Sequence, residues 1–185
     1  PTPPGGSSDP APVTPTVTVT VAVVAPPPAP PRPAPPPPRF AVAAGVGGGP
    51  RVTVFGASAG ERVLDVLAFD PRFTGGVRVA VGDVTGDGVP DVVAAAGPGG
   101  AAAVVLDGRT GEPVVGLAPF EPGYAGGLFA AVGDLNRDGF AEVVVSADAG
   151  GPRVVVFDGA AAARGVARVL ADFLGVPDPA FRGGA

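Results

Sequence analysis

Two short stretches of the chain carry oxygen-bearing side chains at regular spacing. Asp83–Asp91 reads DVTGDGVPD and Asp134–Glu142 reads DLNRDGFAE. Both follow D-x-[TN]-x-D-G-x-x-[DE], with short oxygen side chains at positions 1, 3 and 5 and a carboxylate at position 9. With a backbone carbonyl at position 7, such a loop can wrap a cation that takes roughly six to eight oxygen ligands, and glycine at position 6 permits the sharp turn. Oxygen donors without nitrogen or sulfur favour calcium over zinc or copper.

Two other interpretations of these loops are an EF-hand and a solvated turn. An EF-hand requires an acidic residue at loop position 12, but Ala94 and Val145 stand there and the flanking residues resemble strands. The closing carboxylates would therefore be Asp91 and Glu142, at position 9. Each loop by itself could also be a solvated Asp/Gly turn, yet two copies in register favour a metal site over that interpretation.

Catalysis has little support in this composition. The chain has no His, Cys or Lys, so the usual bases and nucleophiles are missing, and Ser58 and Ser146 have no visible activating partner. A glycosidase-like carboxylate pair, such as Asp70 with Glu121, would need to lie about 5 to 9.5 Å apart. Their matching places in a repeated segment favour a turn instead. We expect no enzyme activity from this segment.

Charge and hydropathy exclude further classes of protein. The net charge is -5 and the 12 basic residues, all Arg, are dispersed, so neither nucleic acid nor an anionic membrane surface is an expected partner. No apolar run approaches the roughly 20 residues of a membrane helix, so we expect no membrane insertion. There is no initiator Met or signal segment, and the sequence is expected to be part of a longer chain.

The first 39 residues differ in composition from the rest. They hold 16 of the 26 prolines and are expected to form a disordered, Pro-rich linker with extended polyproline geometry. Within this segment, residues 16–24 read TVTVTVAVV and alternate with period two, as a strand does. This stretch could be the last strand of a preceding immunoglobulin-like domain, or simply part of the linker.

From Phe40 onward the sequence repeats. The segment FTGGVRVAVGDVTGDGVPDVV, from Phe73, aligns without gaps with YAGGLFAAVGDLNRDGFAEVV, from Tyr124, at a shift of 51 residues. One period contains four short apolar runs separated by turn residues, which predicts four antiparallel strands and hence a β-propeller blade. The predicted strands are Val77–Val81, Asp91–Ala95, Ala102–Leu106 and Pro113–Leu117. The Ala-rich stretch after Asp158 predicts a longer turn and a fourth strand, with one helical turn as the alternative.

The repeat predicts a fold class and an arrangement of loops. We expect an all-β, partial β-propeller at 40–185, an open arc of about three four-stranded antiparallel blades at 40–72, 73–123 and 124–180, with 181–185 as the stub of another. The first blade lacks an acidic loop and contributes only three strands. The acidic loop and the Asp-Gly turn DGRTGE, from Asp107, should share one rim. The Gly-rich turn and the blade crossing should share the other.

Other residues recur at the same place in the repeat. Phe55, Leu106 and Phe157 are predicted to form inter-blade core. Arg51 and Arg153 also match, and they are predicted to be solvated or paired with acids rather than to bind an anion.

These segments resemble the FG-GAP repeats, also called VCBS repeats, which are the calcium-binding blades of integrin-α-like propellers in bacterial surface proteins. The resemblance rests on the spaced acidic loop and on GGPRVVVFDG, and it covers Phe40 to about Ala185. It implies two sets of calcium ligands, with the carbonyls of Val89 and Phe140 completing the side chains of the other residues: Asp83, Thr85, Asp87, Val89 and Asp91 in the first loop, and Asp134, Asn136, Asp138, Phe140 and Glu142 in the second. Glu142 in place of the usual Asp, and the charge of Arg137, predict a weaker second site.

The resulting hypothesis is a calcium-binding propeller segment of a secreted or cell-surface protein, with an adhesive or scaffolding role. The alternative is a propeller module that binds a carbohydrate or protein ligand and is attached to a larger extracellular enzyme. Either function would involve an extracellular partner and further blades of the same full-length chain. A ligand-binding module would be favoured by exposed aromatic residues, and the sequence has one Tyr and no Trp.

Overall fold

The computed structural model describes residues 38–58, 60–178 and 180–184. The predicted linker at 1–39, except for its last two residues, and the possible strand at 16–24 lie outside these ranges. Within the described residues the fold is all-β, as predicted, with one short helix.

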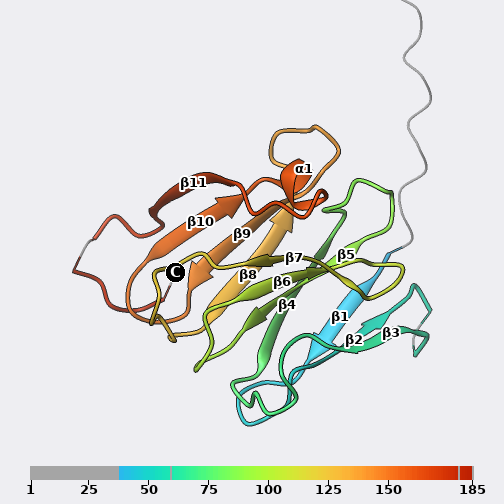
Figure 1. Cartoon of the computed structure of the whole chain (residues 1–185), viewed down its shortest axis with the longest axis horizontal. Coiled ribbons are helices and arrows are strands. Elements are labelled where there is room, and N and C mark those ends of the chain that lie inside the picture. The colour runs from blue at the N-terminus through green and yellow to red at the C-terminus, as the bar shows by residue number, and fades with distance from the viewer. Residues whose placement is uncertain (1–37, 59, 179, 185) are drawn as a thin grey trace, which may run out of the picture. The chain divides into compact units, whose positions relative to one another are not determined.

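The strands form three antiparallel sheets, one for each repeat (Figure 1). We call these sheets blade 1, blade 2 and blade 3. Blade 1 has three strands, β1 (Phe40–Ala43), β2 (Arg51–Phe55) and β3 (Arg62–Leu67). Blade 2 has β4 (Val77–Gly82), β5 (Asp91–Ala96), β6 (Ala103–Leu106) and β7 (Pro113–Leu117). Blade 3 has β8 (Leu128–Gly133), β9 (Glu142–Ala147), β10 (Arg153–Phe157) and β11 (Val169–Leu174).

Each sheet is a meander in which neighbours in the chain are neighbours in the sheet. Short β-branched runs bounded by Gly, Pro and Asp favour this arrangement, because the turns are too short for any crossover. The four strands predicted for blade 2 are confirmed to within one residue at each end. Blade 1 has only three strands among the described residues, as predicted, and begins at the counterpart of β5.

The Ala-rich stretch contains both of the features that were predicted as alternatives. α1 (Gly159–Ala162) is one helical turn, and β11 follows it as the fourth strand. Asp158 caps the helix by accepting a hydrogen bond from the backbone N–H of Ala161 at 2.7 Å. Ala162 is buried and packs into the core between blades 2 and 3.

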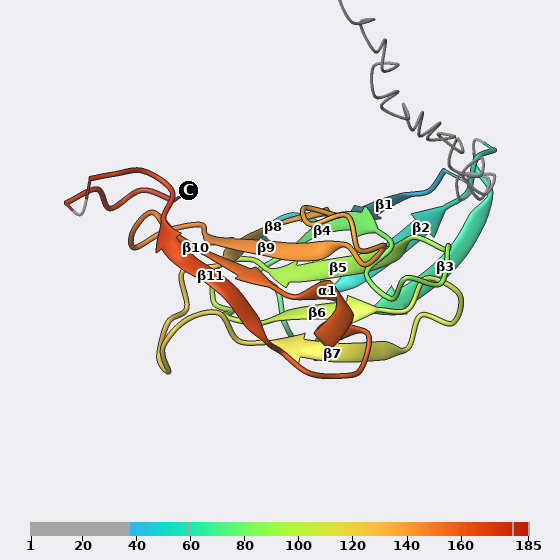
Figure 2. The same ribbon diagram turned by 90° about the horizontal axis from the view of Figure 1, so that it is seen from above.

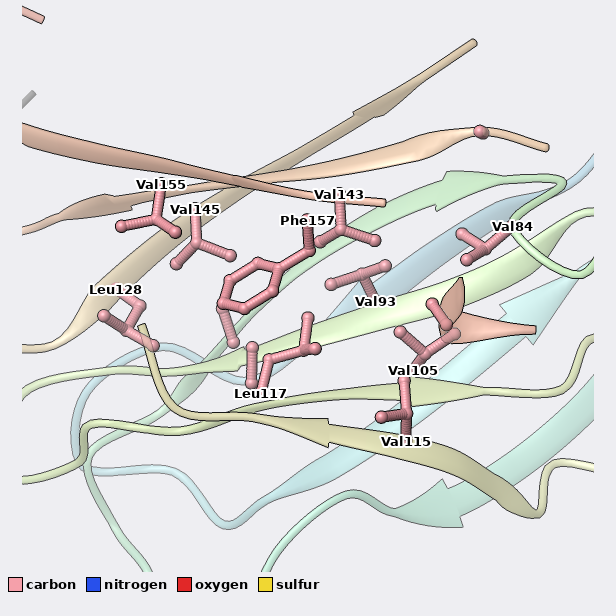
Figure 3. Close-up of a cluster of buried hydrophobic side chains, with 14 residues drawn as sticks. Val84, Val93, Val105, Val115, Leu117, Leu128, Val143, Val145, Val155 and Phe157 are labelled. Carbon is pink, nitrogen blue, oxygen red and sulfur yellow. The ribbon is translucent and has the colours of Figure 1, made fainter. Parts of the chain in front are cut away.

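The three sheets lie one beside the next (Figure 1, Figure 2). The buried core lies between neighbouring sheets. One cluster joins blades 1 and 2, and a second, larger cluster joins blades 2 and 3. Figure 3 shows the second cluster, with the Phe157 ring between strands of the two sheets. Leu106 and Phe157 are buried in these clusters, as predicted for inter-blade core, whereas Phe55 is only partly buried.

The turns lie at two rims, because successive turns of a meander lie at opposite ends of the strands. At one rim, the Gly-rich turn contacts the blade crossing: the N–H of Gly97 donates to the carbonyl of Gly76, and the N–H of Gly99 donates to that of Ala125, both at 2.9 Å. At the other rim, the acidic loop of blade 2 contacts the Asp-Gly turn, since the N–H of Gly108 donates to Asp91 at 2.8 Å, and in blade 3 Gly159 lies against the carbonyl of Ala141. The predicted placement of the acidic loops is therefore confirmed.

Candidate metal-binding loops

The first acidic loop folds around its own backbone. Asp83 accepts hydrogen bonds from the N–H groups of Asp87 (3.1 Å) and Gly88 (2.9 Å), one on each carboxylate oxygen. Asp87 accepts from the N–H of Val89 at 2.8 Å. Gly86 has a positive φ of 71°, which places this backbone turn in the left-handed region. The loop is thus shaped by carboxylates that bind N–H groups ahead of them in the chain.

Asp91, the first residue of β5, is the buried member of the loop. Its carboxylate accepts from the N–H of Thr85 at 2.7 Å and from the N–H of Gly108 at 2.8 Å. Burial raises the pKa of Asp91 above its ordinary value, although these two N–H groups act in the opposite direction. The hydroxyl oxygen of Thr85 is also buried beside this carboxylate and acts to lower the pKa of Asp91, although it makes no hydrogen bond of ordinary geometry within the described residues. One carboxylate therefore joins the acidic loop to the Asp-Gly turn, beside a buried hydroxyl.

The Asp-Gly turn needs its glycine because the acidic loop lies against it. A Cβ atom on Gly108 would lie 2.0 Å from the carbonyl oxygen of Pro90. The equivalent Gly159 of blade 3 would meet the carbonyl oxygen of Ala141 at 2.4 Å. Since Pro90 and Ala141 directly precede the last carboxylate of each loop, the glycine allows the same close approach in both blades.

An arginine reaches the first loop from that same turn. Arg109 donates from Nε to a carboxylate oxygen of Asp87 at 2.5 Å, and from Nη2 to the Asp87 backbone carbonyl at 3.1 Å. This contact raises the pKa of Arg109. Sequence reasoning placed the turn on the correct rim but missed the ion pair. The only available signal was an arginine in a turn that was predicted to face an acidic loop.

The second loop uses an amide where the first has a hydroxyl. Glu142, also buried, accepts from the N–H of Leu135 at 2.7 Å. The Asn136 side-chain amide donates to Glu142 and to Asp138, both at 3.1 Å. These two N–H donors lie between two carboxylates that would otherwise repel each other. The neutral amide thus places the positive end of its dipole between two carboxylates that a cation could otherwise bridge.

The backbone of the second loop differs from the first at one place. Asp134 accepts from the N–H groups of Arg137 (2.7 Å) and Gly139 (3.2 Å). Arg137 has φ 64°, whereas the first loop has Gly86 at this position. No other non-glycine residue in the described ranges has a positive φ. The second loop therefore keeps the shape of the first, although Arg137 must adopt a backbone conformation that is unfavourable for a residue with a side chain.

The ten predicted ligand residues all lie in these two loops, but their side chains face their own backbone and each other. Among residues 38–58, 60–178 and 180–184, no three Asp or Glu side chains converge as a metal-binding cluster. The first loop nevertheless fits a hard cation, since it places a buried hydroxyl oxygen at Thr85 beside a buried carboxylate at Asp91. Such a cation would have to displace Arg109 from Asp87.

The opposite rim carries arginines paired with acids, as predicted. Arg153 binds Asp172 at 2.7 Å and Glu121 at 2.9 Å, and Arg51 binds Asp65 at 2.7 Å. The hydrogen bond from Arg153 lowers the pKa of Asp172. These pairs leave little capacity for an anion at either arginine.

The two carboxylates considered for catalysis close equivalent turns in the blade crossings. The carbonyl of Asp70 accepts from the N–H of Phe73 at 2.8 Å, and that of Glu121 accepts from the N–H of Tyr124 at 3.2 Å. The Asp70 side chain also accepts from the N–H of Arg72 at 2.8 Å. This geometry agrees with a role in shaping the crossing.

Comparison with known proteins identifies the repeat. Residues 83–145, about a third of the chain, match the FG-GAP-like repeat family. The match begins at the first acidic loop and ends in β9, after the second loop. No curated protein matches the chain. No helix in the described residues is long and apolar enough to cross a membrane. Residues 83–145 therefore match the FG-GAP-like repeat family, and the structure folds them as parts of two consecutive antiparallel β-blades.

Proposed function

We propose that the two acidic loops bind calcium, and that the blades act as a calcium-stiffened module in a secreted or cell-surface protein, with an adhesive or scaffolding role. The observation that carries the proposal is the environment of Asp91. Its buried carboxylate receives two N–H groups and no guanidinium among the described residues, and the buried Thr85 hydroxyl lies beside it with no hydrogen bond of ordinary geometry there. A bound cation would satisfy both groups.

The ligands would be those implied by the family resemblance. In the first loop they are the side chains of Asp83, Thr85, Asp87 and Asp91 with the Val89 carbonyl, and in the second those of Asp134, Asn136, Asp138 and Glu142 with the Phe140 carbonyl. When bound, calcium supplies the positive charge that offsets the repulsion among the carboxylates. With dissociation constants of about 0.1 to 1 mM, millimolar calcium would stabilise the fold by about 0.4 to 1.4 kcal/mol per site. Calcium would therefore add only a small increment to the stability of the blades, while apolar burial between the sheets provides most of it.

The contacts of each loop suggest what opposes calcium. In the first loop, Arg109 competes for Asp87. In the second, the Asn136 amide occupies the space between Asp138 and Glu142, and the longer Glu142 side chain is already engaged with the N–H of Leu135. We expect the second site to be weaker, because its amide must turn its oxygen toward the ion.

The experiment is calorimetric calcium titration of the 185-residue chain, with thermal melts in EDTA and in millimolar calcium. Arg109→Gln should tighten the first site and enlarge the calcium-dependent shift in Tm. Arg51→Gln is the matched control, since Arg51 is also paired with an aspartate but lies at the other rim, and it should leave calcium binding unchanged. Absence of heat and of a melting shift in both the wild type and Arg109→Gln would mean that the loops are only turns.

A second candidate is the binding of a carbohydrate or protein ligand by a propeller module attached to a larger extracellular enzyme. One observation favours it: Phe120, Tyr124 and Arg153 line a pocket of about 80 Å³ at the rim opposite the acidic loops. Tyr124 is the only tyrosine, so its fluorescence would report a ligand there. Titration with monosaccharides and disaccharides that leaves this fluorescence unchanged would argue against a sugar site.

A further inference from the structure

The two acidic loops contact each other across the boundary between blades 2 and 3. The N–H of Ala141 in the second loop donates to the backbone carbonyl of Asp83 in the first loop at 2.8 Å. The Phe140 ring lies on the backbone of Gly86, so closely that a Cβ atom at Gly86 would be 2.6 Å from the ring. Two adjacent residues of the second loop therefore hold two places in the first.

Apolar burial makes this contact stiff. Val84 of the first loop is 0% exposed and Ala141 of the second is 6% exposed, and both belong to the core cluster between the blades (Figure 3). Closely packed side chains resist displacement, because even a small gap loses contacts on both sides. A rearrangement of one loop must therefore move the contact that it shares with the other.

The contact also joins the residues that organise each loop. The carboxylate of Asp83 receives two N–H groups of its own loop, while its carbonyl receives the N–H of Ala141. In the second loop, Phe140 and Ala141 directly precede Glu142, whose buried carboxylate receives the N–H of Leu135 at 2.7 Å. The first residue of one loop is thus bonded to the closing segment of the other.

The first loop shows that an acidic loop does not need this contact in order to fold. It has Val89 and Pro90 where the second loop has Phe140 and Ala141. Proline has no N–H, so Pro90 cannot donate the bond that Ala141 makes. Both loops nevertheless bind backbone N–H groups with their carboxylates in the same way. Phe140 and Ala141 therefore serve the connection between the loops rather than the shape of the second loop.

We propose that Phe140 and Ala141 are positioning residues for the first loop, and that through them the two acidic loops behave as one coupled unit. A change in one loop then alters the order of the other. For a bound ion, this inference rests on the proposed calcium function. Coupling between two sites is reciprocal, so an ion that orders the second loop would tighten the first, and the reverse, by the same factor. The two sites would fill over a narrower range of calcium than independent sites.

The first experiment uses the 185-residue chain in EDTA, so that it does not depend on calcium. Asp83→Asn weakens the carboxylate that holds the first loop. Amide hydrogen exchange, followed by NMR, should then accelerate about fivefold at Leu135 and Gly139 in the second loop, as expected for the loss of one hydrogen bond. The same change is then made in a chain that carries Phe140→Val and Ala141→Pro, which we call the Val-Pro variant. There, Asp83→Asn should leave exchange in the second loop unchanged.

The Val-Pro variant copies residues that the first loop already uses, so we expect it to keep the circular dichroism spectrum of the wild type. If it does not, Phe140→Val alone replaces it and should reduce the effect of Asp83→Asn. Phe129→Val is the matched control, because this ring of blade 3 packs on Arg78, 4.4 Å from ring centroid to guanidinium, and it should leave the effect intact. No acceleration in the wild-type background, or equal acceleration in the Val-Pro variant, would overturn the proposal.

A calcium titration tests the same coupling with an ion present. Asp138→Ala removes a proposed ligand of the second loop, and calorimetry should show the calcium affinity of the first loop fall about fivefold or more. In the Val-Pro variant, Asp138→Ala should leave the first site unchanged. If the wild-type chain binds no calcium, the proposed function fails, and hydrogen exchange still decides whether the loops are coupled. If it binds calcium and Asp138→Ala never affects the first site, the loops are independent and the proposal is wrong.

Discussion

Phe157 and Phe55 occupy one position of the repeat in two different environments, and this allows a direct test of how the fold is stabilised. Phe157 is 2% exposed in the cluster between blades 2 and 3, whereas Phe55 lies partly buried on the open face of blade 1. Truncating each to alanine removes the same atoms from the same place in the blade. Any difference between the two losses in free energy of unfolding then measures the contribution of the neighbouring sheet that packs on Phe157.

The expected magnitudes follow from burial. A fully buried phenylalanine removes about 150 to 250 Å² from water, and Phe→Ala in a core costs about 3 to 5 kcal/mol once the cavity is included. Phe157→Ala should lower the free energy of unfolding by this amount. Phe55→Ala loses its stacking on Phe40 and part of its burial, so we expect a loss of about 1 kcal/mol.

The assay is urea unfolding in EDTA at about 1 µM protein, where association contributes least, followed by far-UV circular dichroism. Fluorescence of Tyr124, the single tyrosine, gives a second probe, and coincident transitions would justify a two-state treatment. If Phe157→Ala costs no more than Phe55→Ala, packing between blades is not what stabilises this fold, and the assignment of the inter-blade core is wrong.

Two further predictions concern the Asp-Gly turn. Gly108→Ala should cost about 2 kcal/mol or more, because its Cβ would lie 2.0 Å from a backbone carbonyl, while Gly116→Ala, with nothing within 4 Å of its Cβ, should melt within a few degrees of the wild type. Burial acts to raise the pKa of Asp107, but the N–H groups of Thr110 and Arg109 together lower it below the ordinary value of about 3.8. The carboxylate of Asp107 therefore stabilises the fold fully above about pH 3.8, and this contribution is lost as the pH falls through the lower pKa of the folded state. Asp107→Asn should therefore reduce Tm slightly at pH 7 and leave it unchanged near pH 2, and an equal loss at both pH values would contradict this linkage.

The strands and rims could be predicted because they depend on local patterns. Alternating apolar residues between Gly- and Asp-rich turns fix where a strand such as Val77–Gly82 begins and ends, and the meander then decides which turns share a rim. Because the repeat aligns without gaps, each element is predicted independently from two segments of the sequence. The combined turn and strand after Asp158 could be placed for the same reason, although not the extent of its single helical turn.

The contacts of the candidate site were harder to predict, because they depend on the direction of long side chains between separate turns. Nothing in the spacing of the acidic loop indicates that Arg109 reaches back to Asp87, or that the Asn136 amide bridges two carboxylates. The half-exposed state of Phe40 is likewise a property of its neighbours. Its apolar character predicts burial, and only the packing of the sheets shows which face lacks a partner.

The close approach of Gly108 to the acidic loop also suggests how such repeats diverge. Blade 1 has no acidic loop, and there the position of Gly108 is taken by Ala57, which is exposed. Once a loop is lost, nothing selects against a side chain at the turn, whereas a blade that keeps the loop must keep the glycine. In this chain the two features occur together: blades 2 and 3 have both the acidic loop and the Asp-Gly pair, and blade 1 has neither.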